Sequence, residues 1–137
     1  MSELERVMGA YQSPLLGLAA FVRQLGGIRD KGLPSQACML VKSLLELGAR
    51  EQTALQKVEM LLAGMELRFI NYFTEAQRLG ELDSKLDPTR LGRRLQAEVM
   101  GLRAFAQRDV ESAAVQALAE DMALSIEGLR IDKPVGV

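Results

Sequence analysis

The feature that most constrains the fold is an unbroken apolar stripe between residues 51 and 79. Its members recur at alternating spacings of three and four residues: Leu55, Val58, Leu62, Met65, Phe69, Tyr72, Ala76 and Leu79. This spacing places all of them on one side of an α-helix, about 43 Å long at roughly 1.5 Å per residue. A second stripe on the nearly opposite side contains Met60, Ala63, Leu67 and Ile70. We therefore expect a central helix that is sandwiched between other helices and projects beyond Ile70 along one neighbour.

Helix start and stop signals divide the rest of the chain. Ser13 before Pro14 and Asp87 before Pro88 each combine an N-cap side chain with a proline at the first helical position. Glycines at 26, 27, 48 and 80 are placed to end helices, in many cases through the left-handed conformation. The expected helices cover residues 3–11, 14–25, 36–47, 51–79, 88–107 and 110–129, with Asp109 capping the last. No strand candidate is found, so we predict one all-α domain of five to six helices over residues 1–137.

Composition excludes several classes of function. The chain has no histidine, which removes histidine general bases, Ser-His-Asp triads and histidine zinc sites. A net charge of −1 gives no overall attraction for phosphate backbones. The single Cys38 cannot form an internal disulfide and fits a reducing cytoplasm. No signal peptide or membrane-spanning segment is expected, and nothing in the residues supports an enzyme.

Several residues that could carry chemistry are better explained structurally. Cys38, near the start of a predicted helix, is interpreted as a small buried hydrophobe because it lies in an apolar run. A di-metal site would need histidines beside its helical glutamates, so we expect neither a metal nor another cofactor. The arginines in "TRLGRRLQ" have acidic residues nearby and predict a solvated face. Methionines at 39, 60, 65 and 100 fill the core or, as an open alternative, line a cavity.

A row of small residues in the 88–107 helix predicts a close contact. Gly101 lies inside a helix, where glycine costs about 1 kcal/mol relative to alanine, so a neighbouring chain segment is expected to approach there. That neighbour is either the last helix or a second copy of the chain. We predict a two-fold dimer in which the last two helices form a four-helix bundle. The expected interface residues are Ala97, Gly101, Ala104, Ala113, Ala117 and Leu124.

Four segments carry a resemblance to a known family. They are "ACMLVK" at residues 37–42, "AQRLGEL" at 76–82, the Asp87-Pro88 helix start, and "GLRAFA" at 101–106. Together they resemble the C-terminal regulatory domain of TetR-family bacterial transcriptional repressors, over roughly residues 14–129. The family's helix-turn-helix, through which it binds DNA, has no counterpart in this sequence. The resemblance thus indicates a fragment of a repressor or a naturally headless relative, meaning one without the DNA-binding domain.

The resemblance implies a domain that binds a small, largely apolar effector and dimerises through its last two helices. In such domains the pocket lies among the middle helices, and either Arg103 or Tyr72 would be its polar anchor. The ligand-binding residues expected on this basis are Phe21, Met39, Met65, Phe69, Tyr72, Met100 and Arg103. An alternative function is a stand-alone interaction protein that heterodimerises with a full-length repressor and removes it from DNA.

Overall fold

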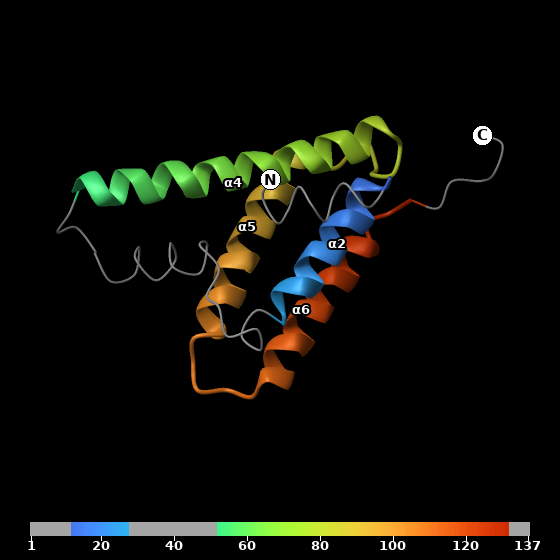
Figure 1. The fold of residues 1–137 in the computed structure, drawn as a ribbon. Helices are drawn as coiled ribbons and strands as arrows, with labels where there is room; N and C mark the ends of the chain where they lie inside the picture. The colour runs from blue at the N-terminus through green and yellow to red at the C-terminus, as the bar shows by residue number, and fades with distance from the viewer. Residues whose placement is uncertain (1–11, 28–51, 132–137) are drawn as a thin grey trace.

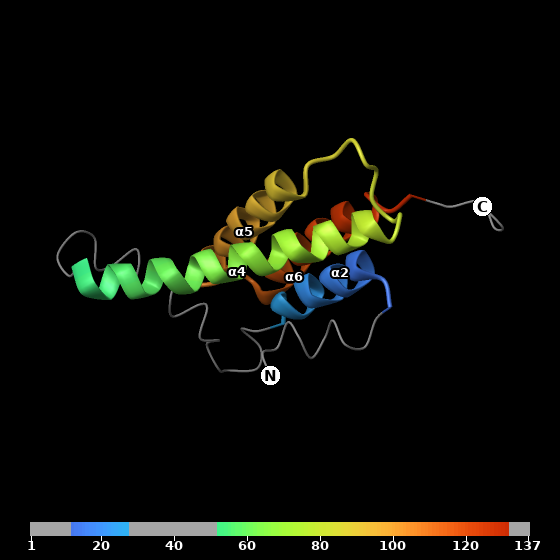
Figure 2. The same cartoon turned by 90° about the horizontal axis from the view of Figure 1, so that it is seen from above.

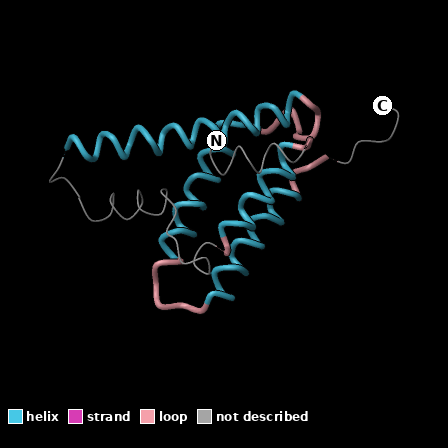
Figure 3. The backbone as a smooth tube through the Cα atoms, viewed as in Figure 1, coloured by secondary structure: helices cyan, strands magenta, loops and turns pink. Residues whose placement is uncertain are grey.

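The computed structural model describes residues 12–27 and 52–131, and in this part of the chain all regular structure is helical (Figures 1 and 3). The helices are α2 (Pro14–Leu25), α4 (Gln52–Arg78), α5 (Pro88–Phe105) and α6 (Ser112–Glu127). All four helices expected within these ranges are present. The expected helices at 3–11 and 36–47, with Cys38 and Met39, lie outside the described residues.

The predicted caps of α2 and α5 are confirmed. The Ser13 hydroxyl oxygen accepts a hydrogen bond from the backbone N–H of Leu16 at 3.1 Å. The Asp87 carboxylate accepts one from Thr89 N at 2.9 Å. Each side chain satisfies one of the N–H groups that a helix start leaves without a partner.

The predicted cap of α6 is wrong. Glu111, not Asp109, occupies the N-cap position, and its side chain makes no capping bond. The chain first completes a tight turn, in which Arg108 N donates to Phe105 O and Val110 N donates to Arg108 O. Asp109 is used inside this turn, so α6 begins later than expected and α5 ends two residues earlier, at Phe105.

Two glycines show different reasons for ending a helix. Gly80 has φ 82°, and Glu81 N donates back to Ala76 O at 2.9 Å, the pattern of a left-handed helix end. Gly26 instead keeps a right-handed φ of −63°, contrary to expectation. A Cβ added there would lie 2.8 Å from the Ala119 Cβ, so Gly26 is needed for the close approach of α2 to α6.

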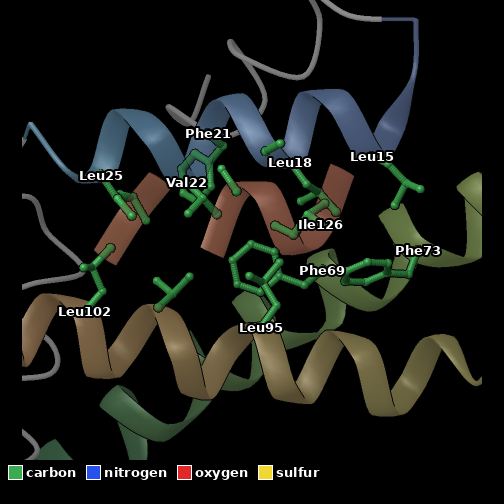
Figure 4. Packing of buried hydrophobic residues seen from close by; sticks show 14 of the residues in the cluster. Leu15, Leu18, Phe21, Val22, Leu25, Phe69, Phe73, Leu95, Leu102 and Ile126 are labelled. Atoms are coloured by element: carbon green, nitrogen blue, oxygen red, sulfur yellow. The ribbon is translucent and has the colours of Figure 1, made fainter. Parts of the chain in front are cut away.

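The helices pack as two pairs around one core (Figures 1 and 2). One pair is α2 with α6, and the other is α4 with α5. Figure 4 shows the apolar side chains between them, including Leu18 and Phe21 of α2, Phe69 of α4 and Leu95 of α5. Because α2 also contacts α4, its apolar side chains join the two pairs.

The long helix α4 packs differently from the expectation. Its second half enters the core through Phe69, Phe73 and Ala76, rather than projecting along one neighbour. The second stripe is not sandwiched, because the side chains of Met60 and Leu67 remain 74% and 56% exposed. Periodicity identified both stripes correctly but could not indicate which of them is buried.

Residue Glu81, just after α4, connects three parts of the fold. Its carboxylate lies 3.4 Å from the backbone N of Leu15, near the start of α2. The same carboxylate accepts a hydrogen bond from Arg130 at 3.2 Å, beyond the end of α6. Its backbone oxygen accepts from Ile131 N at 2.7 Å. The start of α2 and the segment after α6 are thereby held at one corner.

The crossing of α4 and α5 depends on Gly92. A Cβ added at Gly92 would collide with the Ile70 side chain and lie 2.8 Å from the Ile70 backbone N. Real Cβ atoms do not approach backbone atoms this closely, so alanine at 92 would push the two helices apart.

We expect Gly92→Ala to destabilise the fold. Overpacking of this kind typically costs about 1–3 kcal/mol, against a gain of about 1 kcal/mol from helix propensity. Urea unfolding followed by circular dichroism measures the net change. Gly64→Ala is the matched control, since an added Cβ there meets no described atom within 4 Å. Equal stabilisation by both substitutions would contradict the close crossing at Gly92.

Ion pairs also connect α2 to α6. The Arg23 guanidinium donates to Glu120 at 2.8 Å and to Glu127 at 2.7 Å. The hydrogen bonds from Arg23 lower the pKa of both carboxyl groups below their ordinary value, and those from Glu127 and Glu120 raise the pKa of Arg23. All three side chains are partly exposed, so water screens much of the attraction.

These ion pairs predict a specific pH dependence. A carboxyl pKa lowered by folding stabilises the fold above the ordinary pKa, and the contribution is lost as pH falls below about 5. Arg23→Gln should therefore lower the urea midpoint modestly at pH 7, with the difference from wild type shrinking in acid. Arg78→Gln is the control, because Arg78 pairs with Glu75 within α4 alone. A difference that grows as pH falls would contradict this assignment.

Candidate functional site

A shallow groove of about 60 Å³ lies between α5 and α6, with Phe73 of α4 also in its lining. Most of its lining is apolar, and its polar members are Arg94, Glu98 and Ser125. The remaining lining residues are Phe73, Leu91, Leu95, Met122, Ile126 and Leu129. Arg94 and Glu98 form an ion pair of 2.8 Å along α5. The groove is far smaller than the roughly 300–1,000 Å³ of a drug-sized ligand pocket, so it fits side chains better than a free ligand.

The predicted interface residues lie on the surface of these two helices. Ala97, Gly101, Ala113 and Ala117 are exposed, Ala104 is half-buried, and Leu124 is 53% exposed. Leu118, which sequence reasoning did not place at the interface, is 39% exposed. These positions therefore remain available for contact with another molecule.

The surroundings of Gly101 test the prediction that either the last helix or a second copy of the chain contacts it. No heavy atom of the described chain lies within 4 Å of where its Cβ would be. Helix α6 of the same chain is therefore not the segment that requires glycine at this position. Contact of Gly101 with a second copy of the chain stays a prediction.

The predicted ligand-binding residues fall into different environments. Phe21 and Phe69 are buried in the core, with ring centroids 6.2 Å apart at an interplanar angle of 50° (Figure 4). Tyr72 is half-buried and packs against the same cluster. Met65 and Met100 are half-buried but do not belong to it. The structure thus brings together Phe21, Phe69 and Tyr72, while Met39 lies outside the described residues.

Two polar residues of α5 are buried on its inner side. Gln96 is 6% exposed and Arg103 is 5% exposed, and they lie seven residues, or two turns, apart. Gln96 Nε2 donates to Leu62 O at 3.1 Å, whereas its buried Oε1 has no hydrogen-bond partner among the described residues. Arg103 was predicted as a site residue, but Gln96 was missed. Its spacing from Gly92, Val99 and Arg103 was the available signal, since all four share one helical face.

The buried polar groups of α5 lie beside apolar side chains. The inner side of α5 combines an amide oxygen and a guanidinium with apolar neighbours, a combination suited to orienting a small molecule. In residues 12–27 and 52–131, no three acidic or cysteine side chains gather closely enough to hold a metal ion. Within the same ranges, no helix has the length and apolar character needed to cross a membrane.

Comparisons with known proteins add no relative. The chain matches no protein-family model, no curated protein and no solved structure.

The burial of Phe69 predicts a structural role for this side chain. Phe69→Ala should destabilise the fold by about 3–5 kcal/mol, the usual cost of removing a buried phenylalanine. Met65→Ala is the comparison variant. Because Met65 is only half-buried, this substitution should lower the free energy of unfolding clearly less. Urea unfolding at neutral pH measures both. Comparable small losses would indicate that Phe69 borders open space rather than packed core.

Proposed function

We propose that this chain is the effector-sensing and dimerisation domain of a TetR-like transcriptional repressor. In this proposal a small, largely apolar effector binds inside the domain, and DNA is contacted only through a separate helix-turn-helix domain. The proposal is supported by the all-α fold, by the Asp87 cap before Pro88, and by the helix end at Gly80. The last two features belong to segments on which the resemblance rests.

One observation carries the proposal: α5 has a buried polar face and an open outer face on the same helix. Gln96 and Arg103 point inward, whereas Ala97 and Gly101 point outward. An effector that contacts the inner face and a partner that contacts the outer face would therefore both touch α5. This placement gives the two binding events a physical route for coupling.

The proposed mechanism is a population shift. An effector with higher affinity for one placement of α5 would favour that placement over others. Because α5 would also form part of the dimer interface, its movement would change the angle between the two copies. In a complete repressor, this change would alter the spacing of the DNA-binding domains and hence operator affinity.

The effector site is proposed on the inner side of α5 and α4. Arg103 is the preferred polar anchor because it is buried, whereas Tyr72 is only half-buried. Gln96 is added to the proposed effector-binding residues as a hydrogen-bond acceptor through its Oε1. A fitting effector has an apolar body, a hydrogen-bond donor for Gln96 and an acceptor or anionic group for Arg103.

Thermal-shift measurements test the sensing role. The compounds tested are hydroxylated aromatic carboxylates and hydroxylated medium-chain fatty acids, with the matching unsubstituted hydrocarbons as controls. A true effector at 100 times its Kd should stabilise the domain by about 2.7 kcal/mol. Gln96→Leu, which replaces the amide with an apolar side chain of similar size, should reduce this stabilisation.

Two results would contradict the proposal. If none of the compounds stabilises the intact dimer, the sensing role loses its support. Sedimentation as a monomer at tens of micromolar protein would remove support for the dimer.

A further inference from the structure

We draw no further inference here: the strongest candidate, the exposed apolar surface patch of Met60, Leu61 and Leu67 on α4, carries none because nothing in the described part of the chain shows what covers it.

Discussion

The fold depends on the burial of α2 against its pair partner α6 on one side and against α4 of the other pair on another. Eight of its twelve residues are buried, so this helix has apolar contacts on most of its circumference. Helix α6 covers one side through the close approach at Gly26, and Phe69 of α4 covers another through its contact with Phe21. Without α2, the apolar faces of the other helices would be exposed to water, since α5 and α6 make limited contact with each other.

Local sequence signals predicted the helices well because their causes are local. A serine or aspartate before proline satisfies free N–H groups at a helix start wherever it occurs, and both such caps are present. Alternating three and four spacing likewise identified the apolar stripe of α4. The α6 start was misplaced because the preceding turn is determined by how the chain returns from α5, and side-chain chemistry does not encode that path.

Features that depend on neighbouring helices were less accessible from sequence. Gly26 looked like a left-handed helix end, yet its role is to admit Ala119 of α6. Phe69 looked like a pocket residue, and the structure shows it fully buried in the core cluster. Gln96 was overlooked because a glutamine on a helix is usually solvated, and only the position of α4 shows that it is buried. In each case the sequence indicated that a neighbouring helix makes contact, but it did not indicate which helix.

The corner at Glu81 has a consequence for how movement would pass through the molecule. One residue in the turn after α4 contacts the beginning of α2 and the residues following α6. A rotation of α4 about its own axis would displace this turn and, with it, both of those chain segments. The turn at Glu81 thus couples the position of α4 to the positions of two chain segments that are distant from it in sequence.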